Sequence, residues 1–510
     1  MITEIALFIV AAFGVFYLWV RERYKYFEKL GIEYAKPTFL VGSQKEVFFQ
    51  QQNFFDSSEP MYKFGKSSII GIFETIQPIY LFKSPELCRQ IFIKDFTHFV
   101  DHRKFFNDDG LFDHSLIQLE GDKWKEMRST LSPAYTGNKM RGMFELIREI
   151  AQQASLHLKE KELGKDVNLK EFFSRFANDV IASTAFGFKI NSLEDKDNEF
   201  YKMGKEVTVF SSFDMIKFLA LSFFNKYCKY LGISIMSKRQ NNYYMNLVLG
   251  AMKNRKDQKI FRPDMINMLM EVRGIGVQGT AEYKSHYDWT DKEIVAQCFI
   301  FFFAGFDTVS TILSFLGHEI MVNPEVQERL KEEIMGIHND GPLTYEALGK
   351  MKYTEAVIYE TLRMWPAVPF LDRRCTKAID LVDTETGKIV KLKQGDQIVV
   401  PIVGIHRDEK YFPEPLKFDP ERFSEENKHN IPVNAFMPFG IGPRMCIGNR
   451  FAIMEMKALL FYLMKDVSFE KSEKSTIPMA LDPASAQMEP KGGFMVKVVG
   501  ETHQNFYIST

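Results

Sequence analysis

The sequence predicts a mainly α-helical protein with small β-sheets, an α+β fold, held at a membrane by one N-terminal helix. Three observations support this. Most of the chain carries apolar residues at helical spacing. Short segments with β character lie early and late in the chain, and an unbroken apolar run lies near its start. No repeat, low-complexity tract or obvious linker divides the rest, so we expect one domain over residues 46–510.

The apolar run covers residues 5–20 and is followed at once by Arg21 and Arg23. Positive charge after the run predicts that this side stays in the cytosol. As a helix the run spans roughly 24 Å, a little less than a hydrocarbon core of about 30 Å, and its neighbours can extend it. A cleavable signal peptide would have its basic residues before the run, and a surface helix would need a polar face. We therefore expect an uncleaved signal anchor over residues 1–25, followed by a short basic tether over residues 26–45.

Within the domain, apolar runs between turn residues predict strands at 69–73, 78–82, 398–403 and 494–499. Helices are predicted at 123–131, 139–159, 167–186, 237–256, 291–323, 324–337, 353–364 and 447–465. Pro324 should end the longest helix, because proline cannot continue it.

The longest predicted helix is apolar enough over residues 294–316 to be mistaken for a second membrane span. Its polar residues argue otherwise. Ala304, Asp307, Thr308 and Thr311 fall on one stripe at helical spacing, while the other faces are apolar. We expect a buried central helix with a functional stripe.

A glycine-rich loop, FGIGPRMCIG over residues 439–448, leads into the last predicted helix. Glycines let a backbone pass close to a flat ligand, and a thiolate near a helix start is favoured by the helix dipole. Arg444 offers a cation two residues before Cys446, suited to an acidic cofactor edge. The loop therefore indicates a metal ligand at Cys446, whereas an isolated cysteine is more often a small buried residue in a turn.

Composition excludes several other classes of protein. The chain of 510 residues has a net charge of -1, so no nucleic-acid partner is expected. Its five cysteines are scattered, odd in number and free of any C-x-x-C pair. This argues against a disulfide framework and a structural zinc site.

The loop at 439–448 matches every fixed position of F-G-x-G-x-R-x-C-x-G and thus resembles the haem-binding signature of the cytochrome P-450 family of haem-thiolate monooxygenases. Residues 304–308, AGFDT, resemble the oxygen-activation motif A-G-x-[DE]-T of that family. W-x-x-x-R at Trp124 and E-x-x-R at Glu360 occur in the order typical of the family. The resemblance covers nearly all of the chain after the tether, although the usual proline-rich hinge is reduced to Pro37. It implies the cytochrome P-450 fold, with haem between the long central helix and the helix after the cysteine loop.

The resemblance implies heme b, iron protoporphyrin IX, with the thiolate of Cys446 as its axial ligand. It also implies that Trp124, Arg128, Arg373 and Arg444 reach the haem propionates. Arg103 is a further candidate from a loop without a motif, and Arg374 is an alternative to Arg373. The other residues expected beside the cofactor are Phe439, Gly440, Gly448, Ala304 and Gly305.

Roles for two further groups of residues follow from the same resemblance. Asp307 and Thr308 are expected to relay protons to oxygen, although a threonine bonded to its own helix is the plainer interpretation. Glu360 and Arg363, with Arg422 in FDPERF, are expected to form a charged triad that supports folding and haem incorporation. The E-x-x-R spacing alone is weak evidence, because it recurs at 86–89 and 145–148, where a solvated pair is the default.

The substrate pocket is expected to use residues 103–119, 301–308, 367–371 and 485–488, with Phe301, Ala304, Phe370 and Leu371 as substrate contacts. Residues 210–230 are apolar and aromatic. In the family this region dips into the bilayer as a substrate entrance, while a plain surface loop is the alternative.

Residues 129–134, STLSPA, and the motif at 304–308 resemble microsomal animal members of the family, especially the insect branch that oxidises xenobiotics. The resemblance therefore implies a monooxygenase that inserts one oxygen atom from O2 into apolar small molecules, xenobiotics such as insecticides or plant toxins. An endogenous lipid or steroid hormone is the alternative substrate. A haem-thiolate isomerase or dehydratase, and a non-catalytic haem sensor or lipid-binding protein, are alternative functions. The domain should lie on the cytoplasmic face of the endoplasmic reticulum membrane, in contact with lipid.

Electrons are expected from NADPH through a separate cytochrome P-450 reductase, with cytochrome b5 as a second donor. The reason is that the chain has no dinucleotide or flavin fingerprint. A basic stretch around the predicted tryptophan helix could meet an acidic partner, although charged helix faces are usually only solvated. It consists of Lys123, Lys125, Arg128, Lys139 and Arg141.

Overall fold

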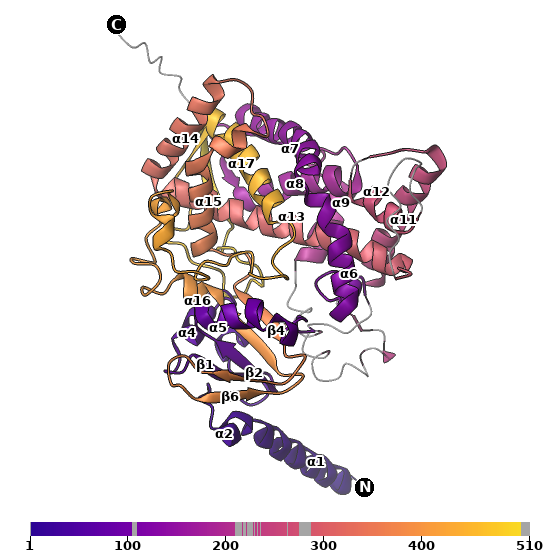
Figure 1. The fold of residues 1–510 in the computed structure, drawn as a ribbon, viewed down its shortest axis with the longest axis vertical. Coiled ribbons are helices and arrows are strands. Elements are labelled where there is room, and N and C mark those ends of the chain that lie inside the picture. Colours follow the sequence, from indigo (N-terminus) through magenta and orange to yellow (C-terminus); the bar gives the residue numbers. More distant parts are fainter. Residues whose placement is uncertain are drawn as a thin grey trace.

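The computed structural model describes residues 2–104, 110–209, 217, 221, 228, 230, 231, 233, 234, 236–262, 264–274 and 287–500. Helix α1 (Ile2–Arg23) projects from one end of the molecule, and helix α13 (Asp291–Val322) crosses the middle of a larger, helical part (Figure 1). Most of residues 210–230, the expected substrate entrance, lies outside the described residues.

The helical part is built around α13 from helices that the sequence pattern largely predicted. Its longer helices are α6 (Gly121–Leu131), α7 (Gly137–His157), α8 (Leu169–Ile181), α9 (Glu199–Thr208), α11 (Lys238–Gln258), α12 (Met265–Val272), α14 (Pro324–Asn339), α15 (Lys352–Met364) and α17 (Asn449–Asp466). Shorter helices are α2 (Tyr26–Leu30), α3 (Lys45–Phe48), α4 (Ser58–Lys63), α5 (Pro85–Arg89) and α16 (Ile402–His406). Single π or 3-10 turns lie at η1 (Gln90–Lys94), η2 (Phe96–His98), η3 (Phe112–His114), η4 (Ser132–Tyr135), η5 (Leu158–Glu162), η6 (Ala182–Phe186), η7 (Ala347–Lys350), η8 (Pro420–Phe423) and η9 (Lys428–Asn430).

In the part of the chain that the structure describes, three small sheets accompany the helices. The largest has the order β1-β2-β7-β4, with β1 (Ile69–Glu74), β2 (Gln77–Phe82), β7 (Gln397–Pro401) and β4 (Phe370–Arg374). The second pairs β3 (Asp166–Asn168), β9 (Met495–Gly500) and β8 (Val467–Glu470), and the third pairs β5 (Ile379–Val382) with β6 (Ile389–Leu392). The antiparallel pairing of β4 with β7 sets Leu371 opposite Val400 and directs the start of β4 toward the helical part.

Helix α13 is the core helix of the protein. The side chain of Thr290 accepts a hydrogen bond from the Glu293 N–H, and the Glu293 side chain accepts one from the Thr290 N–H, which fixes where the helix begins. Helix α8 packs along it so closely that a Cβ on Gly305 would lie 2.5 Å from Ile181 Cδ1. Gly305 is therefore needed for helix packing. Most of the apolar window of α13 is buried, which agrees with a core helix instead of a membrane span.

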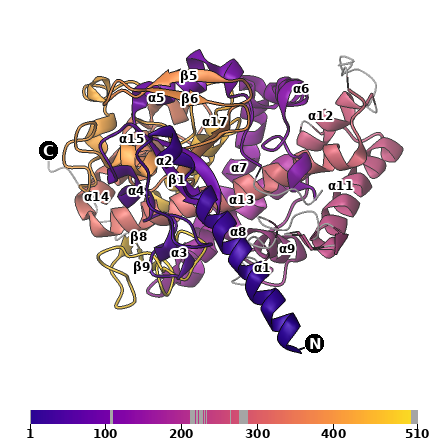
Figure 2. The ribbon, with the colours of Figure 1, turned by 90° about the horizontal axis from the view of Figure 1, so that it is seen from below.

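Helix α1 is long and apolar enough to cross a membrane, and its apolar window is not buried in the protein. Its 22 residues extend about 33 Å, which matches a hydrocarbon core of about 30 Å. It leads away from the domain beyond α2 (Figure 2).

The segment 26–45 differs from the tether that the sequence suggested. Phe27 is fully buried against β1, where a side chain on Gly71 would clash with its ring. The Tyr24 hydroxyl donates to the carbonyls of Thr38 and Thr75, and Tyr34 pairs with Gly71. The prediction of a weakly structured tether is wrong, because these aromatic residues pack onto the first sheet and tie α1 to the domain.

The charged triad is assembled inside the fold. Glu360 and Arg363 on α15 are both 0% exposed, with two hydrogen bonds of 2.7 and 2.8 Å between them. The guanidinium also donates to the carbonyl of His406, and Arg422 Nε lies 3.4 Å from Glu360. Complete burial excludes the solvated pair that this spacing usually indicates.

Candidate active site

One cavity of about 590 Å³ joins the predicted site segments. It lies between the middle of α13, the cysteine loop and the start of β4. The four predicted substrate contacts, Phe301, Ala304, Phe370 and Leu371, all line it. So do Leu116, Ile117, Ala367 and Val368 from the expected pocket segments, whereas residues 485–488 do not. Its walls are mainly apolar.

Backbone contacts hold the cysteine loop in shape. The Cys446 N–H donates to the Phe439 carbonyl at 2.9 Å, and the Met445 N–H donates to the Gly442 carbonyl at 3.0 Å. Gly440 and Gly442 have positive φ angles of 71° and 77°. A Cβ at Gly442 would clash with the backbone of Phe92. The glycines therefore allow the tight turn that brings Cys446 to the cavity.

Cys446 is accessible within the cavity, while the other described cysteines are buried. Surrounding protein raises the pKa of the Cys446 thiol, but the N–H of Gly448 and the Arg128 guanidinium favour its thiolate. Phe439 and Gly448 also line the cavity, whereas Gly440 only shapes the loop. Among the described residues, the geometry thus presents the thiol of one cysteine to the cavity.

A cluster of cations lies at one edge of the cavity. Arg444 donates to the carbonyls of Val100 and Leu119, both at 2.8 Å, and stacks on Trp124 at 4.1 Å. Burial lowers the pKa of Arg444 to about 9, with a further lowering from Arg373, whose own pKa burial lowers to about 10. Two buried guanidiniums that oppose each other's charge would be stabilised by an acidic group.

Arg128 and Trp124 line the same cavity from α6, and Arg128 donates to the Met445 carbonyl at 2.8 Å. No sequence motif marks His102, yet it also lines the cavity, with Nδ1 3.0 Å from Asp372 Oδ1. Its position depends on a contact with β4, so no local pattern could have indicated it.

Two other predicted arginines lie elsewhere. The Arg103 guanidinium donates to Glu74 and, at 2.7 Å, to Gln397, and it does not line the cavity. The Arg103 guanidinium thus lies outside the cavity wall with its charge bound by Glu74 on β1, and its contact with the cofactor stays a prediction. Arg374 pairs with Glu120 at 2.6 Å and with Asp101. This leaves Arg373 as the arginine of this pair that lies next to His102 and Arg444.

The residues of the predicted stripe on α13 lie in two different surroundings. Ala304, Gly305 and Thr308 line the cavity, and the Thr308 hydroxyl donates to the Ala304 carbonyl at 2.6 Å. Asp307 and Thr311 instead contact Lys170 of α8, at 2.8 and 2.6 Å. Asp307 and Thr311 therefore do not line the cavity, because α8 carries a cation that binds them.

A haem group fits the residues that the cavity brings together. Arg373 Nε is buried without a hydrogen-bond partner among the described residues. Arg373 does not itself line the cavity but lies beside His102, which does. Together with Arg444 on the cavity wall it makes this edge cationic, while the Cys446 sulfur lies on a wall made by a glycine-rich loop. A flat acidic cofactor with a sulfur-binding metal would satisfy both features.

Comparisons with known proteins agree with this site. The profile of the family described as Cytochrome P450 matches residues 33–498. "Probable cytochrome P450 9f2" from Drosophila melanogaster is 44% identical, over 97% of this chain and 98% of the relative. "Probable cytochrome P450 9h1" from the same species is 37% identical, over 97% and 98%. "Cytochrome P450 9e2" from Blattella germanica is 38% identical, over 94% of each. The chain belongs to the cytochrome P450 family, and is a monooxygenase whose haem is ligated by a cysteine thiolate.

Proposed function

We propose that this enzyme oxidises apolar small molecules of the xenobiotic kind, such as insecticides or plant toxins, with NADPH electrons delivered by a reductase. The observation that carries the proposal is the apolar cavity, which combines an accessible cysteine, a cationic edge and the Thr308 side of α13. Bound haem supplies the activation of O2, with electron density donated by the thiolate. An endogenous lipid or steroid would also fit apolar walls.

In this proposal Cys446 holds the iron, and Arg373, Arg444, Arg128, Trp124 and His102 hold the acidic edge of the cofactor. The experiment is reconstitution with NADPH, reductase and a panel of insecticides, plant toxins, steroids and fatty acids, with products identified by mass spectrometry. Oxidation of the first two classes is expected. If only steroids are oxidised, the xenobiotic assignment is replaced by a steroid one. If the protein shows no NADPH-dependent oxygen uptake, a non-catalytic haem sensor is favoured.

Thr308 is proposed to hold a proton at the cavity wall, with its hydroxyl oriented by the Ala304 carbonyl. Thr308→Ala should keep haem and substrate binding but divert reducing equivalents to peroxide, so that product per NADPH falls several-fold. Thr308→Ser, which keeps the hydroxyl, is the matched control and should couple nearly as well as wild type. Tightly coupled turnover in Thr308→Ala would contradict this role.

The protein is proposed to be attached to the endoplasmic reticulum membrane, with α1 as its single membrane-spanning helix. Phe48, Phe49 and Phe54 are exposed near the N-terminal part of the domain, and exposed aromatic side chains favour a membrane interface. Removing residues 2–23 should therefore release only part of the protein from microsomes in a sedimentation assay. Complete release would show that α1 is the only attachment.

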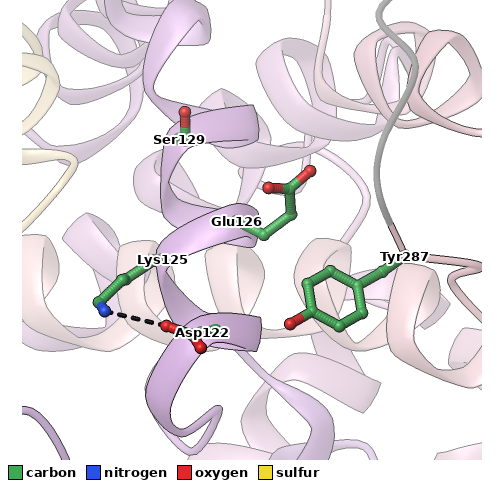
Figure 3. Close-up of a pocket in the computed structure, with 5 residues that line it drawn as sticks. All are labelled: Asp122, Lys125, Glu126, Ser129 and Tyr287. Atoms are coloured by element: carbon green, nitrogen blue, oxygen red, sulfur yellow. Dashed lines mark hydrogen bonds and ion pairs between the residues drawn. The ribbon is translucent and has the colours of Figure 1, made fainter.

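The basic stretch around α6, proposed from the sequence as the docking surface for the reductase, is largely paired with acidic residues in the structure. Lys123 pairs with Glu293 at 2.8 Å, Arg141 with Glu346 at 2.6 Å, and Lys125 with Asp122 at 2.9 Å. Figure 3 shows the last pair beside Glu126 in a recess on the outer face of α6, also lined by Ser129 and Tyr287. Much of the basic charge is therefore balanced within the fold. Lys139 lines the cavity, so Lys125 is the better-placed candidate for docking.

Reversing charge at Lys125 should slow NADPH-supported turnover, most strongly at low ionic strength. Peroxide-driven oxidation needs no reductase and should stay unchanged. Lys474→Glu, which reverses an exposed lysine paired with Asp166, is the control. Equal losses in both assays would mean that Lys125 supports the fold and not docking.

A further inference from the structure

Trp365 lies directly before the part of the cavity wall that connects α15 to β4. That wall consists of Ala367, Val368, Phe370 and Leu371. Val368 is 49% exposed, so a ligand in the cavity can cover it, whereas Trp365 is 8% exposed and does not line the cavity. Only Pro366 separates Trp365 from Ala367, and proline restricts the backbone there. The position of Trp365 therefore determines where the wall begins.

The indole ring of Trp365 is held by residues from other parts of the chain. Phe315 of α13 stacks on it with ring centroids 4.5 Å apart and 5° between the ring planes. Phe55 stacks on it at 5.5 Å, and the Arg407 guanidinium lies 4.7 Å from its centroid. Arg407 also donates to the carbonyl of Met364 at 2.8 Å. These contacts fix the plane of the ring at the end of α15.

A buried hydrogen bond fixes which edge of the ring points to α13. The indole N–H of Trp365 donates to Glu319 Oε1 at 2.8 Å, and Glu319 is 7% exposed. Asn323 Nδ2 lies 3.5 Å from the other carboxylate oxygen. Burial raises the pKa of Glu319 to about 7, and the bond from Trp365 opposes this rise. Both protonation states of a carboxyl group have an oxygen that can accept from an indole, so the contact does not need the charge.

The far end of the same wall is also held. The Ile402 N–H donates to the Pro369 carbonyl at 3.1 Å. The rings of Phe54 and Phe370 lie 4.9 Å apart. Because both ends of the wall are fixed, a change at Trp365 acts on Ala367 and Val368, which lie between them.

We propose that Glu319 and Trp365 are positioning residues, which set the shape of the cavity wall at Ala367 and Val368 and thereby determine which apolar groups the cavity accepts. They act through the backbone of the wall, without contacting the ligand. The inference rests on the proposed function, since it assumes that the cavity binds apolar ligands.

The first test measures azole binding to the full-length protein with haem, because an imidazole nitrogen ligates the iron and moves the Soret band. 4-Phenylimidazole adds an apolar ring that must fit the wall, and imidazole does not. Trp365→Phe, which keeps a stacking ring without the donor, and Glu319→Leu should each weaken 4-phenylimidazole binding several-fold and leave imidazole binding unchanged. An unchanged Kd for 4-phenylimidazole in either variant, or an equal loss for imidazole, would overturn the proposal.

Two controls separate the acceptor from general effects on stability. Glu319→Gln keeps an oxygen for the indole N–H and should bind 4-phenylimidazole nearly as wild type does. Tyr462→Phe removes a hydroxyl that accepts from Gln152 at 3.2 Å, between α17 and α7, and it should bind both azoles as wild type does. Equal weakening by Glu319→Gln and Glu319→Leu would overturn the role of the acceptor. So would additive losses in the Glu319→Leu and Trp365→Phe double variant, because coupled residues should lose little more together.

The wild-type protein separates this inference from the proposed function. It should bind 4-phenylimidazole more tightly than imidazole, since the cavity removes the apolar ring from water. Absence of this preference would contradict the apolar cavity of the proposed function, and the inference would fall with it. A wild-type preference that Trp365→Phe retains in full would overturn the positioning role alone.

Discussion

Cys446→Ser is expected to abolish NADPH-supported oxidation while the protein remains folded. The turn around Cys446 is held by backbone bonds, including the one from its own N–H to the Phe439 carbonyl, so the fold does not need the sulfur. Oxygen activation does need it, because a serine hydroxyl cannot replace a thiolate as electron donor to haem iron. Product formation measured by mass spectrometry, with circular dichroism for the fold, checks this expectation.

Cys375→Ser provides the matched control. Cys375 is buried in the domain, and its sulfur donates to the Lys377 carbonyl at 3.0 Å, a bond that a serine hydroxyl can retain. This variant should keep oxidation close to wild type. Oxidation at the wild-type rate in Cys446→Ser, or its loss in both variants, would contradict the role of Cys446.

Arg363→Ala is expected to remove a large part of the stability of the domain. It deletes two bonds to Glu360 and one to the His406 carbonyl, and leaves the Glu360 carboxylate buried. Truncating one partner of a buried ion pair costs about 3–5 kcal/mol, against a total free energy of unfolding of roughly 5–15 kcal/mol. Urea unfolding and the yield of folded, haem-containing protein measure the effect.

The chain has a control with the same sequence spacing. Glu145 and Arg148 also form an E-x-x-R pair, 2.5 Å apart, but both side chains reach solvent. Arg148→Ala should therefore cost no more than about 1 kcal/mol, as is usual for exposed pairs. Similar losses from the two arginine variants would show that the burial of Glu360 and Arg363 does not decide their contribution.

Features that depend on neighbouring residues could be predicted from the sequence. The cysteine loop is one, because its glycines, arginine and cysteine lie within ten positions. The long helices are another, since their apolar spacing and caps are local signals. Strand β4 was missed, because its sequence FLDRR has no alternating pattern and it forms only by pairing with β7.

Contacts between distant residues decided the rest of the site. Asp307 turns away from the cavity because Lys170, 137 positions earlier, binds it. Arg103 lies away from the cavity because Glu74 and Gln397 meet it across the first sheet. Phe27 packs on Gly71 and thereby converts an expected tether into part of the domain. None of these pairings leaves a local pattern in the sequence.

The spectrum of the ferrous carbon monoxide complex tests the assignment of Cys446 most directly. A thiolate opposite carbon monoxide shifts the Soret band to the red, and other axial ligands do not. The full-length protein and Cys375→Ser should both show the red-shifted band, and Cys446→Ser should lack it. Retention of that band in Cys446→Ser would contradict the account, because another residue would then have to be the haem ligand.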